Sequence, residues 1–195
     1  MKRWAGWAAL ALVVGLALGL VKGDGDVTRG AIGNLSAPWL LLPLWASWKA
    51  GSWHRGAAVG LAITLVGLIG FYGGMFVYVH DHLGLSTSLI SRWVFVLEAN
   101  KIWFLAGLVS GPVVGAVSGL LGQRARGFWL GVVSGLLLLL EMPVVEAIQG
   151  VRLPVVNIAW AAGSQLVYGV EVALGAVLIA VALARRPKPA RPSSA

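Results

Sequence analysis

Two glutamates stand inside long apolar stretches of this sequence, where an ionisable side chain is expensive. Glu141 follows five consecutive leucines, and Glu171 lies within the apolar stretch 159–184. A charged acid near the centre of a lone membrane helix costs about 2.5–3.5 kcal/mol on insertion scales, so it normally faces a partner, a cavity or a proton path. Either glutamate is therefore a candidate general acid or substrate-binding group. The alternative is a neutral carboxyl that bonds to a backbone carbonyl and holds helices together.

Polar and aromatic residues gather on single helical faces when about 100° is allowed per residue. The face on the last apolar stretch holds Asn157, Trp160, Ser164, Tyr168, Glu171 and Gly175. If such faces converge, they enclose a mostly apolar pocket with a few polar groups, which is typical of a small-molecule site. The residues predicted to bind a small molecule are Asn34, Trp45, Phe71, Tyr78, Glu141, Trp160, Ser164, Tyr168 and Glu171. Glu141 and Glu171 become neighbours only if their two helices pack side by side.

A metal site is weakly indicated by His80, Asp81 and His82. Their spacing matches neither the helical i, i+4 pair nor an established zinc motif, and polar residues at headgroup level explain them at least as well. The sequence has no cysteine and no nucleotide-binding glycine loop. No cofactor is predicted.

The composition requires lipid as part of the solvent. The chain of 195 residues is 58% hydrophobic and only 11% charged, against roughly 25% charged for a soluble domain. The net charge of +8 would suggest nucleic acid if it formed a face on a soluble module, but the basic residues lie between apolar stretches. We expect the bilayer as a partner and no nucleic acid.

Six apolar stretches approach the roughly 20 residues that a helix needs to cross a hydrocarbon core about 30 Å thick. They are residues 4–21, 31–48, 56–79, 102–121, 127–147 and 159–184. The predicted fold is all-α, a polytopic bundle of six transmembrane helices in one domain over residues 1–184. The first stretch is longer than the hydrophobic part of a signal peptide, about 7–15 residues, so we expect it to remain uncleaved. Residues 185–195 are expected to form a basic, disordered cytoplasmic tail.

Orientation follows from the basic residues, because short positively charged loops stay on the cytoplasmic side. With the N-terminus inside, the inner segments hold Lys2, Arg3, Lys49, Arg55, Arg124, Arg126, Arg185, Arg186, Lys188 and Arg191. The outer segments hold Lys22, Arg29, Arg92, Lys101 and Arg152. Both termini are therefore predicted to be cytoplasmic. Most tryptophans lie near the ends of the stretches as interfacial anchors, whereas Trp45 lies deeper and Trp39 follows a proline.

Glycines recur every four residues in the fourth and fifth stretches and predict close helix packing. The first set is Gly107, Gly111, Gly115 and Gly119, and the second is Gly127, Gly131 and Gly135. Such ridges let a neighbouring backbone approach, on which helix association in lipid depends. We expect these two stretches to form an antiparallel hairpin; the same spacing also suits a homo-oligomer or a partner membrane subunit.

The stretch Gly33-Asn34-Leu35-Ser36-Ala37-Pro38-Trp39 resembles the signature of a family of small bacterial six-helix membrane proteins catalogued as a domain of unknown function. The resemblance continues through Arg55-Gly56-Ala57 and Gly111-Pro112 to Glu141 and Glu171. Where the family pattern has Glu-Pro in the fifth span, Met142 here separates Glu141 from Pro143. The resemblance implies a multi-pass protein of the bacterial cytoplasmic membrane and points to Asn34, Glu141 and Glu171, but it brings no activity.

Three functions remain open. The first is binding or transport of a small apolar or amphipathic solute in an intramembrane pocket with buried carboxylates. The second is a membrane enzyme that uses a protonated Glu141 or Glu171 as general acid on a lipidic or isoprenoid substrate. The third is a structural or accessory subunit in which the glycine ridges are the working surface.

Overall fold

The computed structural model describes residues 2–22, 26–82, 88–124, 127–148, 152–153, 156–157 and 164–185. The described residues form helices, apart from one pair of two-residue strands and short connections. The helices are α1 (Lys2–Lys22), α2 (Val27–Gly33), α3 (Ala37–Ser47), α4 (Trp53–His82), α5 (Leu89–Arg124), α6 (Phe128–Ile148) and α7 (Gln165–Ala184). The strands β1 (Arg152–Leu153) and β2 (Val156–Asn157) pair antiparallel. Because this pair is so short and the described residues are otherwise mainly helical, the all-α prediction is confirmed.

Four of these helices contain a segment long and apolar enough to cross a membrane. Among the described residues these segments are Arg3–Lys22, Trp53–Tyr78, Phe104–Gln123 and Gln165–Ala184. A shorter apolar segment, Phe128–Val144, makes up most of α6. Together they are consistent with a helical bundle that spans a membrane.

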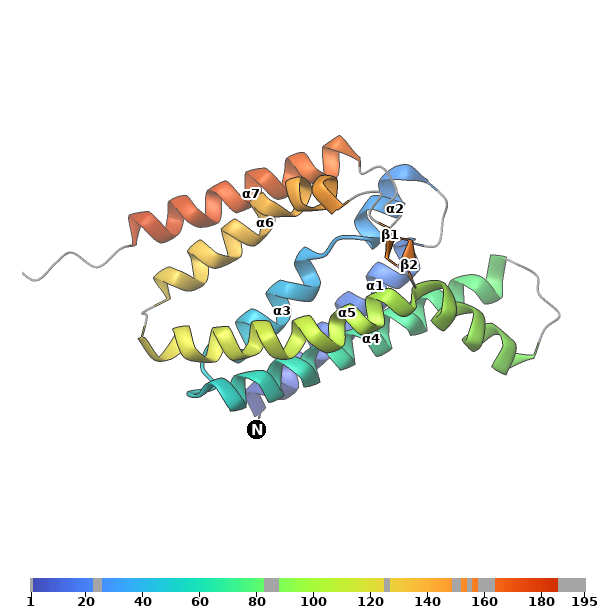
Figure 1. Ribbon diagram of the computed structural model, residues 1–195, viewed down its shortest axis with the longest axis horizontal. Helices are drawn as coiled ribbons and strands as arrows, with labels where there is room; N and C mark the ends of the chain where they lie inside the picture. Colours follow the sequence, from blue (N-terminus) through green and yellow to red (C-terminus); the bar gives the residue numbers. More distant parts are fainter. Residues whose placement is uncertain are drawn as a thin grey trace, which may run out of the picture.

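The helices form two groups with α3 between them (Figure 1). In one group α4 packs against α1 on one side and α5 on the other, while α6 and α7 pack against each other in the second group. Helix α3 contacts α4, α5 and α6, so it joins the two groups. In the view of Figure 1, α1 begins and α7 ends toward the same end of the molecule.

The second predicted stretch, 31–48, is not one helix. Helix α2 starts earlier, where the Asp26 carboxylate accepts bonds from the backbone N–H groups of Thr28 and Arg29, and the helix ends at Gly33. Helix α3 starts afresh behind Ser36, with Pro38 in its first turn, where a missing N–H costs nothing. At about 1.5 Å per residue, its 11 residues reach only roughly 16 Å.

Two other boundaries also differ from the prediction. Helix α5 begins at Leu89 rather than at 102, because a helix can continue through charged residues that end an apolar stretch. Helix α7 begins at Gln165 rather than at 159, and the backbone of Asn157 pairs with Arg152 in the small sheet. Asn157 therefore does not belong to the predicted α7 face. Trp160 and residues 186–195 of the predicted tail lie outside the described residues.

Helices α4 and α5 meet backbone to backbone through glycines. A side chain at Gly60 would overlap the carbonyl oxygen of Gly111, and one at Gly115 would overlap that of Gly56. Side chains of ordinary size would therefore force the helices apart. Contacts this close are a main source of helix association in lipid, where burial of apolar surface contributes little.

The predicted hairpin between the fourth and fifth stretches is wrong. The α5 glycines face α4, and Gly135 of α6 instead lies against the carbonyl of Gly175 in α7. Glycines also bring α1 against α4, where Gly15 meets the backbone of Gly67. Helices α5 and α6 do not pair through these glycines, because the ridge of α5 fits α4 and that of α6 fits α7.

We predict that Gly60→Ala lowers the free energy of unfolding by about 1–3 kcal/mol, since overpacking at a tight contact carries roughly that cost. Gly73→Ala is the matched control in the same helix, because nothing lies within 4 Å of the added carbon. It should be neutral or stabilising by up to ~1 kcal/mol, the gain in helix propensity. Thermal unfolding in detergent, followed by circular dichroism, measures both. If Gly60→Ala and Gly73→Ala change the free energy of unfolding by the same amount, the close packing at Gly60 is contradicted.

Candidate functional site

A cavity of about 410 Å³ lies where α3, α4, α5 and α6 face one another beside the end of α1. Most of its wall is apolar, and it includes Trp39, Leu40, Leu68, Phe71, Leu137, Leu140 and Val144. The polar side chains at the wall are Lys22, Asn34, Ser36, Ser110 and Glu141. This volume and this lining match the usual description of a small-molecule site.

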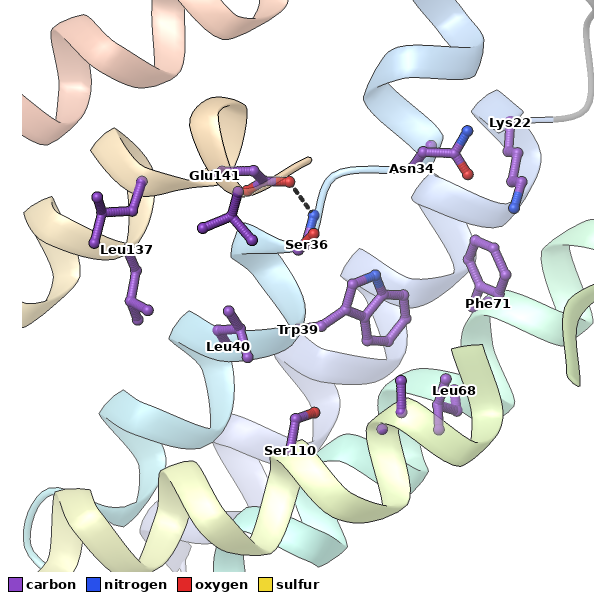
Figure 2. A pocket seen from close by; sticks show the side chains of 15 residues that line it. Lys22, Asn34, Ser36, Trp39, Leu40, Leu68, Phe71, Ser110, Leu137 and Glu141 are labelled. Carbon is purple, nitrogen blue, oxygen red and sulfur yellow. Dashed lines mark hydrogen bonds between the residues drawn. The ribbon is translucent and has the colours of Figure 1, made fainter. Parts of the chain in front are cut away.

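The break between α2 and α3 supplies one rim of the cavity. Asn34 is the C-cap of α2, and Ser36 is the N-cap of α3, so both enter the wall because the helix is interrupted. Figure 2 shows the side chain of Asn34 beside that of Lys22, with the Phe71 ring close to the lysine. The Lys22 ammonium lies 5.3 Å from the centroid of that ring. The cation therefore has a cation–π contact at the edge of the cavity.

Gly33 fixes where Lys22 stands. A side chain at Gly33 would overlap the Cβ atom of Lys22, so only glycine lets α2 approach the end of α1 this closely. The Trp39 ring packs edge-on against the same Phe71 ring, with centroids 5.5 Å apart. These contacts hold Lys22 against an aromatic wall.

Glu141 from α6 binds the first backbone N–H groups of α3. The N–H of Ser36 donates to Oε1, as the dashed line in Figure 2 marks, and the N–H of Ala37 donates to Oε2 at 2.7 Å. The first N–H groups of a helix have no partner within it, and this end carries the positive pole of the helix dipole. The Ser36 side chain makes no capping bond, so Glu141 takes that place. We call this two-bond contact the Glu141 cap.

The partner of Glu141 is thus a backbone donor rather than a backbone carbonyl as the sequence suggested. Because both carboxyl oxygens accept a hydrogen bond, the geometry suits an ionised carboxylate. The carboxylate is only 7% exposed, and it would be costly there without these donors. The cap also fastens α6 to α3 and closes one side of the cavity.

Glu171 lies beside Glu141, since α6 and α7 pack against each other. It is 5% exposed and interacts with Glu141 electrostatically and through a side-chain hydrogen bond. Its Oε2 atom is buried and has no hydrogen-bond partner among the described residues. Tyr168, one turn earlier on the same buried face of α7, lies within electrostatic range of both acids.

The other predicted binding residues divide between the cavity and its surroundings. Asn34 and Phe71 line the cavity as predicted. Tyr78 packs against the buried cluster around Phe71 but is not among the described residues that line the cavity. Ser164 is the N-cap of α7, with no capping bond from its side chain, and is likewise not among them.

Trp45 holds helices together instead of lining the cavity. Its indole N–H donates to the Ser134 hydroxyl of α6 at 2.7 Å, and that hydroxyl donates to the Leu130 carbonyl. The indole also packs edge-on against Trp7 of α1 with centroids 6.3 Å apart. The tryptophan that the cavity uses is Trp39, one and a half turns earlier in α3.

Lys22 was not expected in the site. A lysine directly after an apolar stretch is usually an orienting charge in the headgroup region, and nothing in the sequence places it beside Asn34 and Phe71. The signal that could have found it is Gly33, since a glycine before the Asn34 break permits close approach of another helix.

The metal candidates gain no support from their neighbourhood. Among the described residues, no group of three or more His, Cys, Asp or Glu side chains is placed to hold a metal ion. The side chains of His80, Asp81 and His82 lie outside the described part of the structure. Glu141 and Glu171 contact each other but bring no third ligand of these types.

Comparison of the chain with protein-family models, curated proteins and solved structures finds no match. The assignment of a function therefore depends on the residues of the site and their geometry.

We predict that Glu141→Gln lowers the free energy of unfolding by about 1–3 kcal/mol, because an amide places its NH2 group against a backbone donor that then has no acceptor. Glu146→Gln, on the same helix and exposed, is the control and should change stability by less than about 0.5 kcal/mol. Thermal unfolding in detergent measures both variants. A stable Glu141→Gln protein would show that the cap contributes little.

Proposed function

We propose that this protein is a membrane-embedded binding protein or transporter for a small amphipathic molecule held in the cavity between α3, α4, α5 and α6. The apolar body of that molecule lies against Trp39, Leu68 and the leucines of α6. Its polar end faces Lys22 and Asn34. The single observation that carries this proposal is the 410 Å³ apolar cavity with its polar side chains at the α2–α3 break.

The charge around the cavity favours a molecule with an acidic or hydrogen-bond-accepting head. Lys22 and Glu141 are the charged side chains among the described lining residues. The oxygens of Glu141 are occupied by the N–H groups of Ser36 and Ala37, and the positive end of α3 offsets its charge. The ammonium of Lys22 lies over the Phe71 ring at the edge of the cavity and is the positive charge that would face an acidic head.

The same geometry favours binding over general-acid catalysis. A general acid must hold a proton within reach of the reacting group. Glu141 lines the cavity but accepts at both oxygens, and Glu171 is not among the described lining residues. Neither acid is placed to protonate a molecule in the cavity.

For the membrane arrangement we propose six crossing segments, the second of them interrupted, with both termini on the cytoplasmic side of a bacterial inner membrane. Backbone that is not helical is tolerated at membrane depth where it lines a cavity, which is the position of the α2–α3 break. Arg3 lies in the first turn of α1 and Arg185 is the C-cap of α7. Figure 1 draws the start of α1 and the end of α7 toward the same end of the molecule. The positive-inside rule then favours cytoplasmic termini.

We predict that a small molecule co-purifies with the protein in mild detergent and appears in its native mass spectrum. Ala106→Phe should remove this molecule, because Ala106 lines the cavity and a ring there would occupy the space. Ala62→Phe is the matched control, since Ala62 is an exposed residue of α4 that is not among the described lining residues. It should retain the molecule.

Lys22→Gln tests the proposed polar end in the same experiment. Loss of an acidic molecule in Lys22→Gln, with Ala62→Phe unaffected, supports the orientation given. A molecule that survives in Ala106→Phe lies elsewhere, for instance in the lipid annulus, and would contradict the cavity as the binding site. Folded, empty protein from several lipid backgrounds would count against binding and favour the accessory-subunit hypothesis.

A further inference from the structure

We propose that Glu141 and Glu171 together bind one proton, held on Glu171, and that release of this proton loosens the Glu141 cap on α3. The acid pair would then be a proton site that controls how α6 and α7 are fastened to the rest of the bundle. This inference does not depend on what the cavity binds.

The two carboxyl groups have different surroundings, and that difference places the proton. Both oxygens of Glu141 accept from backbone N–H groups, and they lie at the positive end of α3. The buried Oε2 atom of Glu171, in contrast, has no hydrogen-bond partner among the described residues. A buried charge without partners is far more costly than a neutral carboxyl, so the ionised member of the pair is Glu141.

The contact between the two acids also requires a proton. Two ionised carboxylates are acceptors only, so a hydrogen bond between them needs one carboxylic O–H. The carboxyl group of Glu171 lies close enough to that of Glu141 for a side-chain hydrogen bond. The O–H of Glu171 is the donor in this arrangement, and a carboxylate oxygen of Glu141 accepts.

Among the described residues, the ionisable groups of the elements that pack around Glu171 can be named. Tyr168 shares its face of α7, and Glu146 of α6 acts electrostatically on that tyrosine. Helix α2, which also packs against α7, carries Arg29, which is exposed. Helix α3 has no charged residue, so its contribution at the site comes from its backbone.

Proton release has a structural consequence because Glu141 is shared between two contacts. When the O–H bond of Glu171 breaks, the electron pair stays on the carboxylate and the proton leaves to water. Two negative charges then face each other at hydrogen-bond distance in an apolar setting, and repulsion between them opposes the present position of Glu141. The hydrogen bonds that weaken are those from the N–H groups of Ser36 and Ala37 to the Glu141 carboxylate. Low pH therefore favours the fastened state and high pH the loosened state.

Infrared spectroscopy of the detergent-solubilised protein in D2O tests where the proton resides. The wild type should show a carbonyl stretch of a buried protonated carboxyl that disappears as the pH rises. Glu171→Gln should lack this band, and Glu98→Gln, which removes an exposed acid paired with Lys101, should retain it. In Glu141→Gln the band should remain, since Glu171 is still present. A band that vanishes in Glu141→Gln and persists in Glu171→Gln would overturn the assignment.

Amide hydrogen exchange tests the link to α3. Each pH value compares wild type with Glu171→Gln, so the intrinsic pH dependence of exchange cancels. Peptides that contain Ser36 and Ala37 should exchange alike in the two proteins at low pH and faster in wild type at high pH. If the ratio of the exchange rates of wild type and Glu171→Gln stays constant over the pH range, the proposed link between Glu171 and the start of α3 is overturned. A titration of the infrared band that moves with sodium concentration at fixed pH would show a metal-cation site instead of a proton site.

Discussion

Backbone donors that are left without partners in a membrane must be satisfied inside the protein, and the break before α3 creates two of them. In water these N–H groups would bind solvent, but in hydrocarbon each unsatisfied group costs several kcal/mol. A carboxylate from a distant helix meets both of them, at Ser36 and Ala37. This contact fastens α6 to α3, closes one side of the cavity and accounts for an acid in an apolar stretch. The ionised acid and the broken helix stabilise each other, since either alone would be unfavourable.

Both groups of helices are held together by glycine contacts, and the interface between the groups differs from them. Helix α4 meets α1 and α5 through glycines, which bring main chains together and leave no space between them. Helices α6 and α7 pair in the same way through Gly135 and Gly175. Between the groups lies α3, which contacts its neighbours through side chains such as Trp39 and Trp45, while α2 contacts α7 and α5 contacts α6 less extensively. The cavity forms at this side-chain interface because bulky groups at its edges keep the glycine-packed pairs apart.

The sequence predicted where the helices lie along the chain better than it predicted which helices pack together. Long apolar stretches predicted helices at α1, α4 and α6 within a few residues, because membrane helices need that length. Glu141 and Glu171 were identified from the cost of burying an acid, which is a local property of the sequence. The break at Ser36 was not, since a proline two residues later is compatible with either a kink or a fresh helix start.

Which helix faces meet depends on three-dimensional fit, and this the sequence pattern did not provide. The ridge at Gly111 and Gly115 predicted a close neighbour, but the pattern did not distinguish α4 from α6 as that neighbour. Trp45 and Trp39 lie on different sides of one helix. Only their contacts in the structure show that Trp45 binds α6 and that Trp39 lines the cavity. Lys22 enters the site through a helix end that the sequence alone assigns to the headgroup region.

The separation between Ser36 and Glu141 along the chain, 105 residues, sets a condition on synthesis. Chains grow at about 5–20 residues per second, so α3 leaves the ribosome roughly 5–20 s before the acid that completes it. During that interval the start of α3 must remain near the hydrated membrane surface, within the insertion machinery, or against another polar group. Helix α3 therefore reaches its final surroundings only after α6 has been made, and the fold of this protein is completed out of sequence order.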